Sequence, residues 1–188
     1  MLENYAFSGT KINKEIKLDL ACGLQKAEGY IGVDLLESSH ADIILDLLKF
    51  PWPFEDNSVD DIFCAHFIEH IPKSLFVDDL LFKFFDECYR ILKPGKFLKI
   101  VTPYYSSIRS IQDPTHHRSF GEASFCYFNK KWREENNLGH YPIKCNFSFT
   151  YGLDFHPEYE TRTDEHKIFA VLHYLNVVRD IHVQLIKE

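Results

Sequence analysis

Short apolar runs separated by polar breaks dominate the first half of the chain. They span residues 16–21, 30–36, 41–45 and 60–67. Apolar runs of this length, bounded by turn-forming residues, are typical of buried strands. We therefore predict four strands here, with the proline-containing segment 51–58 as a loop before the fourth.

A helical pattern follows these strands. Between Ser74 and Leu92 the apolar residues recur every three or four positions, which predicts an amphipathic helix with Ser74 as its N-cap. The sequence Lys93-Pro94-Gly95 predicts the end of this helix, and residues 96–102 then form a fifth strand. A strand, helix and strand in this order favour a parallel sheet with right-handed crossovers.

The second half is less regular. Residues 120–159 are rich in aromatic side chains, which we expect to lie mostly in the core. Residues 164–176 look helical, and residues 181–186 alternate in polarity like a half-exposed terminal strand. At 188 residues the chain fits a single domain, with a first half at 16–102 and a second half at 103–188.

Composition narrows the class of protein. Hydrophobic residues make up 45% of the chain and the net charge is −7, which excludes disorder and disfavours binding to nucleic acid or to an anionic membrane. No apolar run approaches the roughly 18 residues that span a bilayer. The five cysteines include no CxxC pair, and the N-terminus lacks the apolar core of a secretory signal, so we expect a cytoplasmic protein.

Acidic residues recur at the strands. Asp19 lies inside the first predicted strand, Asp34 near the end of the second and Asp46 at the end of the third. Ligands of open α/β sheets bind outside the carboxyl ends of the strands. A carboxylate after the second strand can accept hydrogen bonds from both ribose hydroxyls, and one after the third can accept from the adenine amine. The alternative is that these residues serve as turn or cap aspartates.

Several segments together resemble one family. They are KLDLACG (17–23), IGVDL (31–35), DLLKFPWPFEDNSVDDIFCAHFIEHI (46–71) and ECYRILKPGKFLKI (87–100). Their order and spacing are similar to those of class I S-adenosylmethionine-dependent methyltransferases. The resemblance implies an α/β fold with a Rossmann-like, mostly parallel seven-stranded sheet, in which residues 181–186 form an antiparallel C-terminal strand.

The resemblance also implies a site for S-adenosylmethionine. The implied contacts, from the methionine end to the adenine end, involve Asp19, Ala21, Cys22, Gly23, His66, Asp34, Leu35, Asp46 and Leu47. Of these, Asp34 would bind the ribose, and Asp46 with Leu47 the adenine. The 11 positions from Gly23 to Asp34 are too few for the usual helix and its turns, which is similar to a branch of the family with a short cofactor loop.

A second motif competes for part of this region. The residues His66 to His70 match the HxxEH pattern of zinc proteases, which requires both histidines on one helical face. The preceding residues favour a strand, and Pro72 follows closely. We therefore expect no metal, and place Glu69 at the mouth of the cofactor site, where it contacts the acceptor or caps a helix.

The acceptor side is assigned to the segment after the fifth strand. Within it we predict that His116 assists removal of a proton from the acceptor and that Asp113 orients this histidine, while His117 points elsewhere. The alternative is a structural turn. The acceptor is expected to be a small molecule or glycan-like. A second hypothesis is a non-catalytic cofactor-binding or partner-binding module, and the sequence leaves the oligomeric state open.

Overall fold

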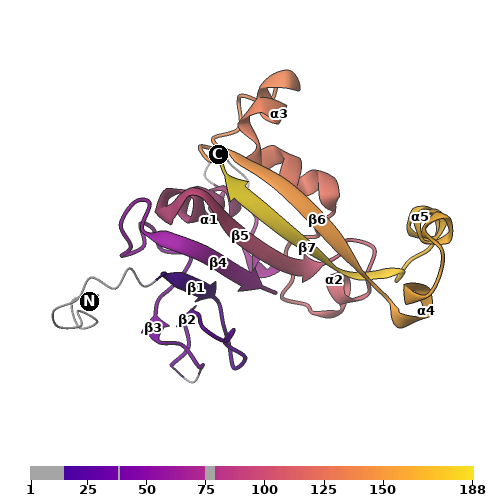
Figure 1. Ribbon diagram of the computed structural model, residues 1–188, viewed down its shortest axis with the longest axis horizontal. Helices are drawn as coiled ribbons and strands as arrows, with labels where there is room; N and C mark the ends of the chain where they lie inside the picture. The colour runs from indigo at the N-terminus through magenta and orange to yellow at the C-terminus, as the bar shows by residue number, and fades with distance from the viewer. Residues whose placement is uncertain (1–14, 38, 75–78) are drawn as a thin grey trace.

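The protein is built around one seven-stranded sheet (Figure 1). The computed structural model describes residues 15–37, 39–74 and 79–188. The strands are β1 (Lys17–Leu20), β2 (Ile31–Asp34), β3 (Ile43–Ile44), β4 (Val59–Ala65), β5 (Leu92–Pro103), β6 (Phe147–Phe155) and β7 (Val178–Lys187). Their order across the sheet is β3-β2-β1-β4-β5-β7-β6.

The first five strands are parallel to one another, and β7 is antiparallel to both β5 and β6. This arrangement confirms the predicted Rossmann-like α/β fold with an antiparallel C-terminal strand. Strand β6 was not predicted, because it lies in the aromatic segment that we assigned to the core. It pairs with β7 along its length, from Phe147 opposite Lys187 to Phe155 opposite Val178.

Apart from α1 and α5, the helices of the described residues are short. They are α1 (Leu80–Ile91), α2 (Arg109–Gln112), α3 (Lys130–Glu135), α4 (Pro157–Glu160), α5 (Asp164–His173) and the 3₁₀ turns η2 (Ile68–His70) and η3 (Glu122–Phe128). Helices α4 and α5 project beyond the end of the β6–β7 pair (Figure 1). Within the described ranges, no helix combines the length and hydrophobicity that crossing a bilayer requires.

Helix α1 departs from the prediction at both ends. The predicted N-cap Ser74 is wrong, since the carboxylate of Asp79 caps the helix by accepting a hydrogen bond from Leu81 N at 2.8 Å. Positions 75–78 of the predicted helix lie outside the described residues. At the other end, β5 begins at Leu92 directly after the helix, so that the proline and glycine of the predicted stop lie inside this strand.

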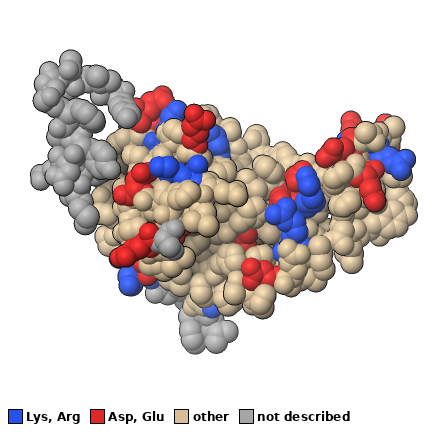
Figure 2. All heavy atoms as spheres, turned by 90° about the horizontal axis from the view of Figure 1, so that it is seen from below, with Lys and Arg blue, Asp and Glu red and all other residues tan. Residues whose placement is uncertain are grey.

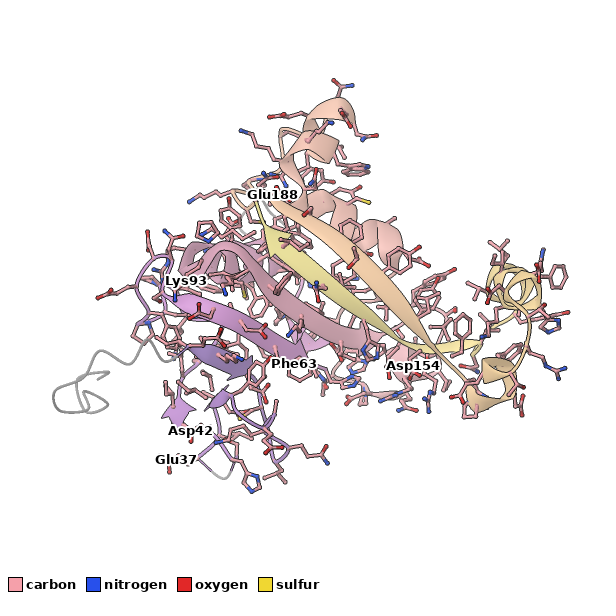
Figure 3. All side chains as sticks on the ribbon, in the orientation of Figure 1. Glu37, Asp42, Phe63, Lys93, Asp154 and Glu188 are labelled. Atoms are coloured by element: carbon pink, nitrogen blue, oxygen red, sulfur yellow. The ribbon has the colours of Figure 1, made fainter. Side chains whose placement is uncertain are left out.

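One face of the sheet carries the core. Helix α1 buries Phe84 and Phe85, and the Phe85 ring stacks on Phe128 of η3 with 3.7 Å between ring centroids. The opposite face of β4 and β5 is half-exposed and polar, with Lys99 Nζ 2.7 Å from the Asp61 carboxylate. Figure 3 shows the side chains of this part of the sheet, including Phe63 of β4.

Candidate active site

The ends of four parallel strands define the candidate site. Strand register places Leu20 of β1 opposite Val33 of β2 and opposite Cys64 of β4, which in turn lies opposite Ile100 of β5. The residues that follow these positions therefore emerge together at one edge of the sheet. This edge is where ligands bind in open α/β folds.

The turn after β1 gives close access to the backbone. Ala21 and Gly23 adopt left-handed conformations with φ of 56° and 52°. A side chain at Gly23 would begin in open space, since its Cβ position has no neighbour within 4 Å among the described residues. The turn is fixed by hydrogen bonds from Ala21 N to Val33 O at 2.7 Å and from His40 N to Gly23 O at 2.8 Å. A ligand at this edge can therefore approach the main chain of Gly23 directly.

Asp19 of β1 holds the loop between β1 and β2 by a hydrogen bond. Its side chain is buried, at 2% exposure for the residue, and Oδ2 accepts a hydrogen bond from Ala27 N at 2.7 Å. Burial raises the pKa of this carboxyl group, although the Ala27 bond opposes the shift. Asp19 thus holds the loop that carries Gly23. The buried side chain of Cys22 lies in the same turn, and burial raises the pKa of its thiol.

Gly32 is a residue of this site that the sequence analysis missed. A Cβ atom on Gly32 would lie 2.7 Å from Lys26 Cδ, 2.8 Å from Cys22 Sγ and 3.2 Å from His40 O. The loop therefore packs directly against the backbone of β2. The signal in the sequence was a glycine inside a strand, which often marks the close approach of another segment.

Asp34 ends β2 with both carboxylate oxygens oriented by the backbone. Oδ2 accepts from Gly23 N and Oδ1 accepts from Leu36 N, each at 2.9 Å. A carboxylate has about four acceptor positions, so two remain for hydroxyl groups of a ligand. The following residue, Leu35, is 58% exposed. The predicted ribose contact at Asp34 therefore has both the place and the acceptor capacity that it requires.

The predicted adenine residues differ from each other. Asp46 is half-buried, its Oδ1 accepts from Leu48 N at 3.0 Å, and its Oδ2 lies 3.4 Å from Lys49 Nζ. Leu47 is only 4% exposed and belongs to the core, so its side chain cannot line an open site. The exposed apolar side chain next to Gly23 is instead Leu24, at 66% exposure.

His66 turns the chain at the end of β4. It adopts a left-handed conformation with φ of 53°, which is uncommon for a residue with a side chain and clusters at functional sites. Its ring, 41% exposed, lies with Nδ1 3.4 Å from Glu69 Oε1. The helix that a zinc-protease HxxEH motif needs is not formed, because only Ile68–His70 turn, as the 3₁₀ element η2.

Beyond His66, a polar cluster forms at the ends of β4 and β5. Glu69 is 1% exposed and accepts a hydrogen bond from Thr102 Oγ1 at 2.9 Å. His70 Nδ1 lies 2.9 Å from Thr115 Oγ1, and the His70 and His116 rings meet edge to face with centroids 4.6 Å apart. The structure thus brings His116 to Glu69 and His70, as expected for residues on one side of the site.

The predicted pairing of Asp113 with His116 is wrong. Asp113 Oδ1 accepts from both the N–H and the hydroxyl of Thr115, at 2.8 and 2.7 Å, and these bonds lower the pKa of the Asp113 carboxyl group. His116 Nδ1 instead lies 3.2 Å from Ser110 O. An aspartate before a proline and a threonine satisfies the nearest backbone and hydroxyl donors first. Through Thr115, Asp113 orients His70.

Backbone bonds fasten the His116 segment to η2. His117 N and Arg118 N both donate to Glu69 O, at 2.8 and 3.2 Å. The Arg118 side chain donates to Ile71 O at 2.8 Å and to both oxygens of Asp79 at 2.7 and 2.8 Å. His117 itself is exposed. Arg118 is a further residue that the sequence analysis did not single out.

The fold and the open strand edge define a Rossmann-like methyltransferase architecture, and comparison with solved structures agrees. A SAM-dependent methyltransferase from Archaeoglobus fulgidus is 19% identical, covering 99% of this chain and 91% of that one with a TM-score of 0.63. An S-adenosylmethionine-dependent methyltransferase from Mesorhizobium loti is 14% identical over 93% and 91%, with a TM-score of 0.52. A possible histamine N-methyltransferase from Thermotoga maritima is 16% identical over 92% and 82%, with a TM-score of 0.54.

A family match by sequence covers part of the first half of the chain. Residues 18–100, which include β1 to β4, α1 and most of β5, match the family described as a methyltransferase domain. No curated protein matches the chain. The family match over this part of the chain and the fold together support an S-adenosylmethionine-dependent methyltransferase of class I, with S-adenosylmethionine as its cofactor. This favours the enzyme over a non-catalytic module.

Proposed function

We propose that this enzyme transfers the methyl group of S-adenosylmethionine to a small-molecule or glycan-like acceptor that approaches from the side of Glu69 and His116. The observation that carries the proposal is the arrangement of the strand edge. The open turn at Gly23 and the oriented carboxylate of Asp34 lie at the ends of β1 and β2, and the Glu69–His116 cluster lies at the ends of β4 and β5.

The residues present fit the cofactor. Gly23 leaves space over its backbone for the methionine part, and Asp34 retains acceptor positions for two ribose hydroxyls. Asp46 and the exposed Leu24 and Leu35 would line the adenine end. Bound there, the cofactor supplies a methyl group activated by a positively charged sulfur. The chain's own residues position it and orient the acceptor against it.

On the acceptor side, His116 and Glu69 are proposed to assist proton removal. A nucleophilic oxygen or nitrogen of the acceptor forms its new bond to the methyl carbon while the carbon–sulfur bond breaks, and the electron pair of that bond stays on sulfur. An acceptor hydroxyl must lose its proton in this step. With Nδ1 next to Ser110 O, His116 has Nε2 free to interact with that proton or with the oxygen that carries it.

The surface charge supports a small-molecule or glycan-like acceptor, and the state of the cysteines supports a cytoplasmic location. On the face shown in Figure 2, lysine and arginine side chains lie beside aspartate and glutamate, without the continuous basic surface that nucleic acids require. All five cysteines are free, and burial raises the pKa of Cys64 and Cys88 well above the usual thiol value. Free thiols of this kind are typical of the reducing cytoplasm, which we propose as the location.

Two measurements test the proposal. Calorimetric titration of the wild-type protein with S-adenosylmethionine should show binding, and no binding at millimolar cofactor would contradict the function. Hydroxylated small molecules and saccharides are then screened for release of S-adenosylhomocysteine. With an acceptor in hand, His116→Ala should lower turnover by roughly 100- to 10,000-fold at unchanged cofactor affinity. If turnover of His116→Ala equals that of wild type from pH 6 to 9, His116 has a purely structural role.

A further inference from the structure

Three potential metal ligands converge at the acceptor side. Glu69, His70 and His116 each offer one ligand atom, and these atoms all lie within 4.8 Å of one another. Two of the residues come from η2 and the third from the segment after α2, so the set is formed by tertiary structure. It differs from the HxxEH set that the sequence suggested, because His116 takes the place of His66. Our expectation of no metal depended on that motif alone and did not consider this set.

The neighbours of the two histidines leave the same ring nitrogen free on each. Ser110 O can only accept, so the 3.2 Å contact makes His116 Nδ1 the donor. The Thr115 hydroxyl donates to the ionised Asp113, whose pKa is lowered, and therefore accepts from His70 Nδ1. In the neutral tautomer that carries the proton on Nδ1, each ring has its lone pair on Nε2. Histidines that ligate metals are oriented in this way, by a carbonyl or a carboxylate on the opposite nitrogen.

Glu69 provides an independent indication. The residue is 1% exposed, and while Oε2 accepts from Thr102, Oε1 has no hydrogen-bond partner among the described residues. The nearest cationic candidate is His66, whose Nδ1 lies 3.4 Å away in a ring that is 41% exposed. A buried carboxylate oxygen without a partner is costly, and a coordinated cation removes this cost.

We propose that Glu69, His70 and His116 bind one divalent first-row transition metal ion such as Zn²⁺. Two imidazole nitrogens and one carboxylate oxygen suit such ions better than Mg²⁺ or Ca²⁺, which prefer oxygen ligands. Three protein ligands leave a coordination position open, as in catalytic zinc sites. The segment that bears His116 is already fastened to η2 by the backbone bonds to Glu69 O, so the ligands are positioned before metal binds.

This site deepens the proposed function and rests on it for its role. An acceptor hydroxyl at the open position would become more acidic, release its proton to solvent and attack the methyl carbon as a metal-bound oxygen anion. In that case Nε2 of His116 binds the metal, so His116 assists proton loss through the ion and does not itself take the proton. Thr115 and Asp113 are positioning residues, because they act through the His70 ring.

Metal binding is tested without cofactor or acceptor. Protein stripped with EDTA and dialysed is titrated with zinc sulfate by calorimetry, and separately with cobalt chloride by visible absorption. One ion per chain is expected, and at a hundredfold excess of free zinc over Kd the Tm should rise by about 5–10 °C. Because this experiment contains no S-adenosylmethionine, failure of metal binding is distinguishable from failure of the proposed methyl transfer.

The chain has ten histidines, and those at the surface could bind zinc without a defined site. Variants distinguish the proposed site from such binding. His70→Ala, His116→Ala and Glu69→Gln should each weaken zinc binding at least tenfold, and Asp113→Asn by about 10- to 100-fold. The control His117→Ala removes the exposed neighbour of His116 and should bind zinc like wild type. Far-ultraviolet circular dichroism and the metal-free Tm verify that each variant folds.

Two results would overturn the proposal. The first is wild-type protein that takes up no zinc or cobalt. The second is zinc affinity that falls as much in His117→Ala as in folded His70→Ala. If Glu69→Gln does not fold, Asp113→Asn decides, since its side chain lies outside the proposed ligand set. Metal-specific absorption bands of the cobalt protein that disappear in folded Asp113→Asn or His70→Ala would support the site.

Discussion

Replacing Asp34 tests the cofactor site most directly. In Asp34→Ala the ligand loses an ionised acceptor for two ribose hydroxyls, and the loop loses the bonds to Gly23 N and Leu36 N, both 2.9 Å long. Hydrogen bonds to charged groups contribute about 1.5–3 kcal/mol each. Two bonds at the lower end give about 3 kcal/mol, which is a loss of about 100-fold in affinity. Asp34→Asn keeps one acceptor oxygen and should lose about tenfold.

The assay is calorimetric titration with S-adenosylhomocysteine, which binds as product and does not react. Asp42→Ala is the matched control. Asp42 accepts from Lys26 Nζ of the same loop and from Gly32 N of β2, each at 2.8 Å, but it directly precedes β3 and lies away from the carboxyl ends of the strands. It should retain an affinity within a few-fold of wild type. Affinity for Asp34→Ala within threefold of wild type, or an equal loss in both variants, would refute the ribose contact.

Three further predictions concern the support of the site. Gly32→Ala should lower both Tm and cofactor affinity, because its Cβ would lie 2.8 Å from Cys22 Sγ, whereas Gly152→Ala, with open space at its Cβ position, should leave both unchanged by thermal melting and titration. The hydrogen bond to Lys26 lowers the pKa of Asp42 below 3.8, so the ionised side chain stabilises the fold above the pKa of the unfolded carboxyl group. The difference in unfolding free energy between wild type and Asp42→Asn should therefore disappear as the pH falls through the folded pKa. Arg118→Met should cost about 3 kcal/mol or more in urea unfolding, since it leaves a mostly buried carboxylate unpaired, and a loss under 1 kcal/mol would contradict that account.

The strands of the first half could be predicted because their signal is local. Each apolar run ends at a turn residue, and the burial of β1 and β4 follows directly from that pattern. Strand β6 also had a local signal, since Phe147, Phe149, Tyr151, Leu153 and Phe155 alternate with smaller or polar residues. We interpreted these aromatics as core packing without testing for a period of two. The error therefore came from the interpretation of a visible pattern.

The acceptor-side cluster could be predicted only in part. The position of His116 after β5 indicated the correct edge of the sheet, but its meeting with His70 depends on backbone bonds from His117 and Arg118 to Glu69 O, across nearly fifty positions of sequence. Hydrogen bonds between main-chain groups do not depend on particular side chains, so the sequence does not indicate which residues will form them. Asp113 likewise accepts hydrogen bonds from the N–H and hydroxyl of Thr115, two residues away, and these local contacts replace the longer pairing with His116 that we predicted.

The short connection between β1 and β2 shows how a reduced cofactor loop can remain ordered without a helix. Carboxylates replace the helical hydrogen bonds: Asp19 accepts from Ala27 N, Asp34 accepts from Gly23 N, and Asp42 accepts from Lys26 Nζ. Each of these side chains belongs to the sheet or directly precedes a strand, so the sheet fixes the loop. Asp34 has a second task in the proposed function, because the carboxylate that holds Gly23 N is also the proposed ribose acceptor. Cofactor binding and loop order are therefore coupled through the Asp34 side chain. A ligand that binds Asp34 meets a loop that Asp34 already holds in place.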